Sequence, residues 1–431
     1  MAVYESSIII PVYNKFDLTR LCLKSLAATT SRDKTEVIVI DNASTDVTPN
    51  ACATLGKNLF GEAFTYIRNE KNRNFAGASN QGAQCAKGDY LVFLNNDTET
   101  RPGWYEPLIA DFTEYANIGA SGPLLFYPPD KIFGHTIQHL GVLVSPQLRF
   151  GHLYAGIPAE SPLAKRRRFF QVITAACMVI PKQLFFNAGG FDEAFINGFE
   201  DIDLCGRLVR LGYRMTVNST SQVIHYESQS EGRKAHDEGN FARVISKTGS
   251  LFQVDWHLHL QKDGLELDVT DDLYLRQALP DKMRKRLDPL AEKLDGEALK
   301  KMLVDFPYWE RGMEAFAKTL EDVDARLKIY ERLFKVNKDP QYLIKSFNTA
   351  LEAGKRNEAT EACKKLFPFL EDAEIYRANA RFARDMCEKM GLSDLAEKFG
   401  KKSTMIGQHT RRQEFLREMR KEMENRLACG A

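Results

Sequence analysis

Apolar runs and helical patterns alternate over roughly the first hundred residues. Short runs that are apolar at nearly every position lie at 7–10, 36–40, 64–67 and 90–94. Between them, residues 16–28, 47–55 and 76–86 carry apolar side chains at helical spacing. Strands that are apolar on both faces and alternate with helices are typical of a parallel sheet covered on both sides. The pattern therefore predicts an α/β fold with a Rossmann-like, mostly parallel sheet.

Polar clusters follow three of the four predicted strands. They lie at 12–14, 41–46 and 95–97, each directly after an apolar run. In open α/β sheets, ligands bind beyond the carboxyl ends of the strands. We therefore expect a ligand site at this edge of the sheet.

A further cluster lies in residues 190–204, where five carboxylates stand among bulky apolar residues. Leucines recur at helical spacing from Leu204 to Leu211, and Gly212 is a typical C-terminal stop. This predicts an amphipathic helix whose first turn carries three acids, Glu200, Asp201 and Asp203. Acids at a helix start are also ordinary partners of the helix dipole, so the pattern alone leaves a structural role open.

Beyond about residue 260 the composition becomes helical, and Leu333-Phe334 and Leu366-Phe367 recur 33 residues apart. The period resembles that of degenerate tetratricopeptide repeats, and a non-repetitive helical bundle is the alternative. Residues 412–427 place an apolar stripe among charges. We expect this tail to be a helix that docks on its own domain or on a second subunit, while its mixed charge disfavours a membrane surface.

The composition limits the classes of function. A chain of 431 residues suggests two or three domains, and its net charge of +1 gives no reason to expect nucleic acid as a partner. The eight cysteines form no CxxC pair, and the longest apolar run, 172–180, is too short to span a bilayer. We expect reduced thiols in a soluble, cytoplasmic protein, with the inner face of the membrane as the alternative location. The basic run 165–168 is a solvated loop or a phosphate-binding loop.

Several ordered motifs within residues 6–230 resemble those of the inverting family 2 glycosyltransferases, which have the GT-A fold, and in particular their rhamnosyltransferase-like branch. The stretches that carry the resemblance are Ile10-Pro11-Val12-Tyr13-Asn14, Asp41-Asn42-Ala43-Ser44-Thr45-Asp46, Asn72 to Asn80, Leu94-Asn95-Asn96-Asp97, Thr174 to Met178, Phe199-Glu200-Asp201-Ile202-Asp203-Leu204, and His225. Asn74 replaces a usual glycine, which asparagine's tolerance of left-handed backbone can absorb. Asn95 replaces the first acid of the family's D-x-D motif.

The resemblance implies a role for each motif. Asp97 and His225 would hold Mn²⁺ or Mg²⁺ on the donor diphosphate, although His225 could also be a satisfied strand-end histidine. Asp201 would be the catalytic base, with Glu200 as its competitor and Asp203 structural. The remaining motif residues would bind the donor nucleotide or sugar: Pro11, Tyr13, Asn14, Asp41, Asn42, Ser44, Asn74, Phe75, Ala76, Asn80, Asn95, Asn96 and Ala176. For Ala176, plain core packing is the alternative.

Two residues are weaker candidates for the acceptor site. Asp192 could touch the acceptor or cap a turn. Trp104, just past the metal motif, could stack on a sugar face or pack at a helix start.

These observations predict a GT-A domain at 1–255, a helical domain at 256–410 and a C-terminal amphipathic helix at 411–431. The expected activity is metal-dependent, inverting transfer of a hexose, deoxyhexose or N-acetylhexosamine from a UDP- or dTDP-sugar. The acceptor would be a glycan, a lipid-linked or a protein hydroxyl, and the helical domain could mediate homo-oligomers. The alternative is a degenerate nucleotide-sugar-binding protein whose helical part is an interaction scaffold. A nucleotidyltransferase is disfavoured, because 11–15 lacks a glycine-rich basic loop.

Overall fold

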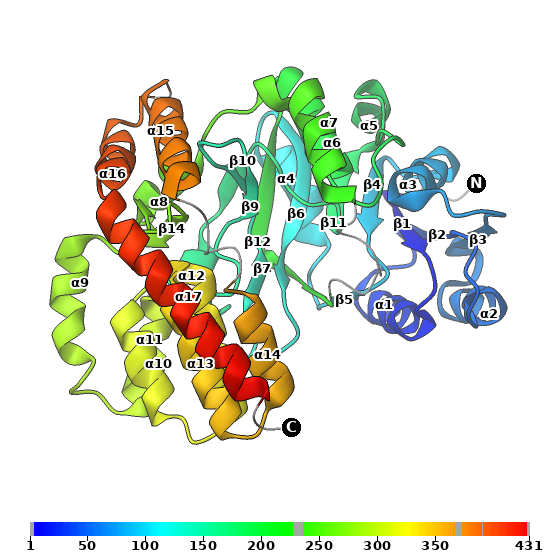
Figure 1. Ribbon diagram of the computed structural model, residues 1–431. Coiled ribbons are helices and arrows are strands. Elements are labelled where there is room, and N and C mark those ends of the chain that lie inside the picture. The colour runs from blue at the N-terminus through cyan, green and yellow to red at the C-terminus, as the bar shows by residue number, and fades with distance from the viewer. Residues whose placement is uncertain (1–3, 227–235, 367–372, 390, 429–431) are drawn as a thin grey trace. The chain divides into compact units, whose positions relative to one another are not determined.

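The computed structural model describes residues 4–226, 236–366, 373–389 and 391–428 (Figure 1). The chain forms two compact units, the first made of Met1–Val144 and Leu148–Gln253 and the second of Ser145–Gln147 and Val254–Ala431. The division at 253/254 lies two residues from the predicted one. Phe367, in the second of the repeated Leu-Phe pairs, lies outside the described residues.

The first unit is built around a ten-stranded sheet with the order β10-β12-β6-β11-β4-β1-β2-β3, to which β5 and β7 are added. Its strands are β1 Ser6–Val12, β2 Thr35–Asp41, β3 Phe64–Arg68, β4 Tyr90–Leu94, β5 Thr98–Thr100, β6 Ile118–Phe126, β7 Ile137–His139, β10 Arg168–Phe170, β11 Cys177–Pro181 and β12 Arg214–His225. A separate pair joins β8 Val142–Val144 and β9 Phe150–His152.

The helices of this unit connect or cover the strands. They are α1 Phe16–Thr29, α2 Thr48–Phe60, α3 Asn74–Cys85, α4 Glu106–Glu114, α5 Lys182–Asn187, α6 Glu200–Arg210 and α7 Asp237–Lys247, with short 3-10 turns at Gly61–Ala63, Pro162–Lys165 and Gly249–Leu251. The α/β fold class predicted from the sequence is confirmed. The predicted helix at 47–55 continues to residue 60, and the one at 76–86 begins at residue 74.

The two faces of the sheet carry different helices because successive strand residues point to opposite sides. Ile8 and Ile10 of β1 belong to a core cluster shared with α1, α2 and α4. Ile9, the residue between them, faces α3, where a Cβ on Gly82 would lie only 2.4 Å from its Cγ2. Glycine at position 82 therefore allows α3 to pack closely on the sheet.

The parallel part of the sheet comprises β4, β1, β2 and β3. Beyond β4 the sheet becomes mixed, because β11 runs antiparallel to both β4 and β6, while β12 runs parallel to β6. The strand β12 therefore points the same way as β4. Its carboxyl end lies on the same edge of the sheet as the ends of β1, β2 and β4.

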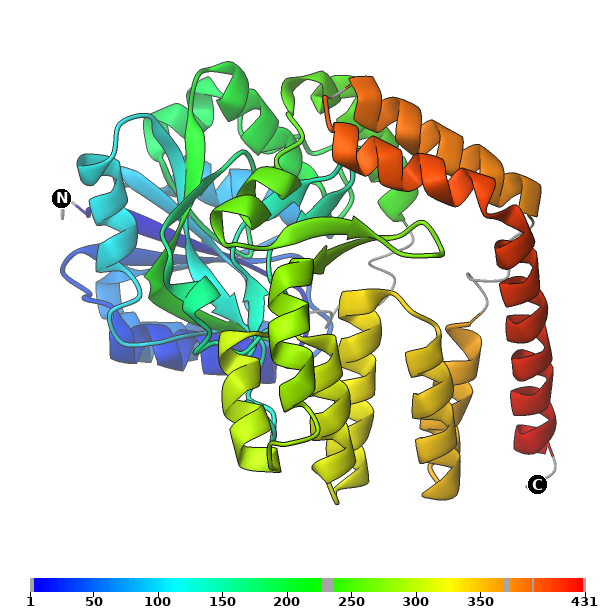
Figure 2. The same cartoon turned by 90° about the vertical axis from the view of Figure 1, so that its left-hand side faces the viewer.

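The second unit is mainly helical. Its helices are α8 Trp256–Lys262, α9 Asp281–Leu287, α10 Gly296–Asp305, α11 Glu310–Thr319, α12 Val323–Asn337, α13 Gln341–Glu352, α14 Arg356–Lys364, α15 Ala373–Lys389, α16 Ser393–Thr404 and α17 Ile406–Ala428, with a 3-10 turn at Asp288–Leu290. Figure 2 shows α10 to α14, in yellow-green to orange, standing side by side. The turns α13–α14 and α15–α16 each contain a glycine, Gly354 and Gly391, at φ 70°. Helix pairs joined by such turns are compatible with a helical repeat, but the tetratricopeptide assignment stays a prediction.

Two details of this unit differ from the sequence expectation. A β-hairpin, β13 Glu266–Val269 with β14 Leu275–Ala278, interrupts the predicted all-helical region. Its first strand alternates buried and half-buried residues, a period of two that the helical composition around it obscured. The last helix begins at Ile406, before the predicted boundary at 411, and Leu416 and Met423 lie in the core cluster of this unit. The tail therefore docks on its own unit.

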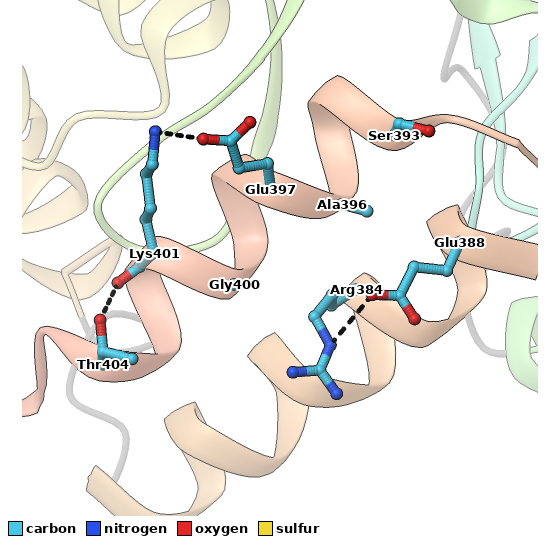
Figure 3. Close-up of a pocket in the computed structure, with 8 residues that line it drawn as sticks. All are labelled: Arg384, Glu388, Ser393, Ala396, Glu397, Gly400, Lys401 and Thr404. Atoms are coloured by element: carbon cyan, nitrogen blue, oxygen red, sulfur yellow. Dashed lines mark hydrogen bonds and ion pairs between the residues drawn. The ribbon is translucent and has the colours of Figure 1, made fainter.

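Helices α15 and α16 enclose an open cleft of about 520 Å³ (Figure 3). The charges that line it pair along each helix, Lys401 with Glu397 at 2.6 Å and Arg384 with Glu388 at 3.6 Å. None of the residues expected to form a site lies in this cleft.

Candidate active site at the carboxyl edge of the sheet

The strands β4 and β12 bring together the two residues predicted to bind a metal. Asp97 follows β4 by three residues, and the short strand β5 then pairs with β12 so that Thr98 lies opposite His225. This pairing places Nε2 of His225 3.1 Å from Oδ1 of Asp97. Both side chains are largely buried, with 6% and 12% of their surfaces exposed.

Gln138 of β7 fixes the orientation of the His225 ring. Its Nε2 donates to the backbone oxygen of His225 at 3.2 Å, so its Oε1 faces the ring and accepts from Nδ1 at 2.7 Å. The tautomer assigned from this network carries its proton on Nδ1 and a lone pair on Nε2. Asn95 Nδ2 lies 3.3 Å from the same Nε2. Sequence reasoning missed Gln138, because nothing in the short segment 137–139 marks it.

The Asp97 and His225 pair fits a divalent cation. A carboxylate oxygen and an imidazole lone pair 3.1 Å apart repel each other unless a proton or a cation lies between them. Among the described residues, no group of three or more His, Cys, Asp or Glu side chains is arranged to hold a metal ion. A cation on a nucleotide diphosphate takes most of its ligands from phosphate and water oxygens, so two protein ligands are sufficient.

The predicted acids occupy the first turn of α6, as expected. Glu200 is buried, and its Oε2 accepts from the amide of Gly198 at 2.7 Å. Asp201 is less buried, and its Oδ2 accepts from the amide of Ala175 at 3.1 Å. Asp203 is buried and pairs with Arg207 and Lys247, which supports its predicted structural role.

The helix ends where expected, at Gly212 with φ 85°. Leu204 and Leu208 are buried, but Leu211 is 50% exposed, so the predicted apolar stripe is one residue too long. The cause is that Leu211 caps the helix and already leaves the face that packs on the core.

Residues 174–176 connect α6, which carries Asp201, to the Asp97 and His225 pair. The amide of Ala175 holds Asp201, and the oxygen of Ala176 accepts from the amide of Asn95 at 2.9 Å. On the other side, the amide of Thr174 donates to Nε2 of His139 at 3.4 Å. Hydrogen bonds to the adjacent residues Ala175 and Ala176 therefore link Asp201 to Asn95, and Asn95 in turn contacts His225.

His139 is a buried histidine that sequence reasoning did not single out. Burial lowers its pKa well below the usual value, and the neighbouring His152 and His225 add to this effect. Its Nδ1 lies 2.7 Å from Nδ1 of His152. Neutral His139 therefore accepts from Thr174 and donates to His152, and it supports the segment beneath Asp201.

The motif after β2 folds on itself. Asp41 has no exposed surface, because its Oδ1 accepts from the amide of Ser44 at 2.8 Å and its Oδ2 from the hydroxyl of Tyr66 at 2.6 Å. Asn42 is also buried, with its amide bonded to Asn74 and Asn69. In this structure the side chains of Asp41, Asn42 and Ser44 therefore hold the loop, and their contact with the donor stays a prediction.

The motif after β1 remains partly open. Tyr13 is 50% exposed, while Pro11 and Asn14 are half-buried. Asn14 has φ 58°, and its Oδ1 accepts from the amides of Thr45 and Asp46. Its side chain thereby ties this turn to the loop after β2, and Tyr13 is the residue of the motif that offers a free face.

The predicted donor residues of α3 join this helix to residues 190–199. Asn74 has φ 57°, which confirms the left-handed conformation expected there. The amide of Phe75 donates to Asn197 at 3.2 Å, and Ala76 is buried. Asn80 donates twice, to the oxygen of Phe191 and to Glu193, and accepts from the amide of Phe191. The side chain of Asn80 therefore holds residues 191–193, and its contact with the donor stays a prediction.

The other predicted residues are distributed as follows. Asn96 is half-buried and donates to Thr19 of α1 at 2.9 Å, while Ala176 is buried beside β4. Of the basic run 165–168, Arg167 pairs with buried Asp111, and Arg168 donates to the oxygen of Leu163. These two arginines are structural, so the phosphate-binding interpretation is not supported for them.

For both acceptor candidates, the structure shows the structural role that the sequence analysis gave as the alternative. Trp104 is fully buried in the core and donates through Nε1 to Thr30 at 3.0 Å, so it cannot stack on a sugar. Asp192 caps the turn at Ala194 and pairs with Lys247 at 2.7 Å. Partial burial alone would raise its pKa, but the hydrogen bonds from Lys247 and Ala194 outweigh burial, and the pKa is lowered.

Comparison with known proteins shows which proteins the chain is similar to. A family model described as glycosyl transferase family 2 matches residues 7–171. This match covers less than half of the chain and includes the motifs at 10–14, 41–46, 72–80 and 94–97 that carry the resemblance.

Individual relatives extend over more of the chain. The O-antigen biosynthesis protein RfbC of Myxococcus xanthus is 31% identical over 242 residues, which cover 54% of this chain and 18% of that protein. The N-acetylglucosaminyl-diphospho-decaprenol L-rhamnosyltransferase of Mycobacterium tuberculosis is 25% identical over 282 residues, which cover 60% of this chain and 86% of that protein. The chain thus spans less than a fifth of the length of the first of these relatives.

The chain also aligns with solved structures, at low scores. A crystal structure of GalNAc-T7 with UDP, GalNAc and Mn²⁺ aligns at 19% identity and a TM-score of 0.46, and covers 57% of this chain and 48% of that one. Within the part of the chain that the structure describes, no helix is long and apolar enough to cross a membrane.

Proposed function

We propose that this protein is a metal-dependent, inverting glycosyltransferase that moves a hexose, deoxyhexose or N-acetylhexosamine from a UDP- or dTDP-sugar to a hydroxyl group. The observation that carries the proposal is the Asp97 and His225 pair at the carboxyl edge of the sheet, with the His225 lone pair aimed at Asp97 by Gln138. The match to glycosyl transferase family 2 supports the reaction class.

The metal pair would serve the donor diphosphate. Asp97 and His225 would hold Mn²⁺ or Mg²⁺, and the bound cation supplies charge neutralisation, which makes the nucleotide diphosphate a better leaving group. Asn95 and Asn96 stand next to Asp97, with amide groups suited to phosphate or sugar oxygens. Exposed Tyr13 offers a face on which the nucleobase can stack.

Asp201 would be the general base. Its Oδ2 accepts from the amide of Ala175, a hydrogen bond that fixes the orientation of the carboxylate. The base takes the proton of the acceptor hydroxyl as that oxygen attacks the anomeric carbon and the nucleotide diphosphate departs from the opposite face. A single displacement inverts the anomeric centre. A positioned base of this kind contributes a factor of about 10² to 10⁴.

The acceptor would be a glycan or a lipid-linked glycan, with a protein hydroxyl as the other possibility carried from the sequence. The proposal draws on the names of the relatives, one for O-antigen biosynthesis and one for transfer of L-rhamnose to N-acetylglucosaminyl-diphospho-decaprenol. The second unit would present this acceptor or assemble the enzyme.

The test is the stereochemistry of slow transfer to water. The full-length protein is incubated with UDP-N-acetylglucosamine and with dTDP-rhamnose, each with Mn²⁺, and the first-formed free sugar is followed by proton NMR. Release of a sugar with the anomeric configuration opposite to that of the donor supports the proposal. A retained configuration contradicts inversion, and no nucleotide release from any UDP- or dTDP-sugar contradicts the transferase itself. Asp201→Asn serves as the control for contaminating hydrolases.

A further inference from the structure

Residues 190–199, called here the 190–199 loop, lead directly into the acids of α6. Several of its residues have left-handed backbone: Gly190 at φ 67°, Asn197 at φ 50° and Phe199 at φ 71°. Left-handed backbone is uncommon for a residue as bulky as Phe199 and persists only where the surroundings enforce it. Since Phe199 immediately precedes Glu200 and Asp201, whatever enforces this loop also sets the start of α6.

Two asparagines hold the two ends of the loop in the same way. Asn80 of α3 accepts from the amide of Phe191 at 3.0 Å and donates to its oxygen at 2.8 Å. Asn240 of α7 accepts from the amide of Ile196 at 3.3 Å and donates to its oxygen at 2.9 Å. Each side-chain amide therefore pairs with both backbone groups of one loop residue, as a neighbouring strand would.

Further contacts come from α7, which lies beside α6 (Figure 1). Lys247 pairs with Asp192 of the loop at 2.7 Å and with Asp203 of α6 at 3.1 Å. The ring of Phe241 meets that of Phe199 edge to face, with centroids 6.2 Å apart. One face of α7 thus contacts the loop at its beginning and its end, and α6 as well.

We propose that Asn240 is a positioning residue for the transfer reaction, which acts through Ile196 and the 190–199 loop to hold Asp201 in place. This inference rests on the proposed function. Asn240 is buried, and its two hydrogen bonds to Ile196 leave its amide a single orientation. The loop between Ile196 and Asp201 spans only four residues, so a shift at Ile196 is transmitted to the carboxylate. A displacement of about 1 Å in a reacting group costs on the order of 10²-fold in rate.

The experiment compares Asn240→Ala and Asn240→Asp with wild type in the full-length protein. The Asp variant keeps the acceptor for the Ile196 amide but places a carboxylate against the Ile196 oxygen. Asn58→Ala, an exposed position on α2, is the matched control. Nucleotide release from UDP- and dTDP-sugars gives kcat and KM, calorimetry gives the affinity for UDP or dTDP with Mn²⁺, and hydrogen exchange reports the Ile196 and Phe191 amides.

We expect both Asn240 variants to lower kcat by about 10-fold or more, with nucleotide affinity unchanged and exchange accelerated at Ile196 but not at Phe191. If the variants fold and their Ile196 amide exchanges faster, but their kcat equals that of the wild type, the positioning role of Asn240 is overturned. The proposed function is not affected by that result. A parallel loss of nucleotide affinity and kcat would also overturn the positioning role, because it would indicate general destabilisation. A wild-type protein inactive with every donor would instead overturn the proposed function, and this inference with it.

Discussion

The carboxyl ends of β2 and of β4 both carry polar residues that resemble family motifs, but the structure uses them differently. After β2, Asp41 is fully enclosed, and its carboxylate is taken up by Ser44 and Tyr66. After β4, Asp97 faces His225 across a gap that suits a cation. The difference shows that residues of one motif set can have two roles. Some stabilise the loops around a site, and others are placed to bind its ligands. Burial and hydrogen-bond partners distinguish the two groups.

The largest effect should come from Asp201, the proposed general base. Asp201→Asn removes the proton acceptor while it keeps the shape of the side chain. We expect turnover to fall about 10²- to 10⁴-fold, with the affinity for UDP or dTDP unchanged. Steady-state kinetics and calorimetry on the same preparation check this. Retained turnover would move the base to Glu200.

The substitution Asp97→Asn should abolish metal binding at the end of β4. Loss of the anionic ligand removes several kcal/mol of charge stabilisation, so turnover should fall by at least about 100-fold. Stabilisation of the protein by nucleotide should no longer depend on Mn²⁺, as seen in the melting temperature. Asp33→Asn, an exposed carboxylate in the loop before β2, is the matched control and should leave both quantities unchanged.

Asp41→Ala should act on stability rather than on metal binding. It leaves the Ser44 amide, the Tyr66 hydroxyl and nearby Arg68 without their acceptor. We expect a loss of about 2–4 kcal/mol in the free energy of unfolding, measured by urea denaturation. A large loss of Mn²⁺-dependent nucleotide binding at unchanged stability would contradict the division made above and restore Asp41 to the donor site.

The smallest effect concerns pH. Because the pKa of His139 is lowered below its usual value of 6.5, the unfolded chain binds a proton that the folded protein does not. The contribution of His139 to the free energy of unfolding is fully present above pH 6.5. It is lost as the pH falls toward the pKa of the folded state, by at most about 1.4 kcal/mol per pH unit. His139→Gln should flatten the unfolding free energy between pH 6.5 and 5. If the free energy of unfolding of the variant depends on pH as in the wild type, other titrating groups determine the pH dependence between pH 6.5 and 5.

The sequence predicted the elements of about the first hundred residues well, because the buried strands and helices there differ clearly in period. The strand pattern also placed Asp97 at the carboxyl edge of the sheet, and the motif resemblance grouped Asp201 and His225 with it. The sequence could not predict Gln138 or Asn240, whose partners lie 87 and 44 residues away and follow no local pattern. Trp104 shows the converse: its position after Asp97 suggested an acceptor contact, whereas packing on the core decided its role.

The most direct test of the account is the binding of UDP and dTDP to the full-length protein by calorimetry, with and without Mn²⁺, in wild type and in Asp97→Asn. The account predicts that wild type binds at least one of the two nucleotides much more tightly with Mn²⁺, and that Asp97→Asn loses this difference. Metal-independent binding, or no binding of either nucleotide, would contradict the claim that Asp97 and His225 form the metal site of a glycosyltransferase.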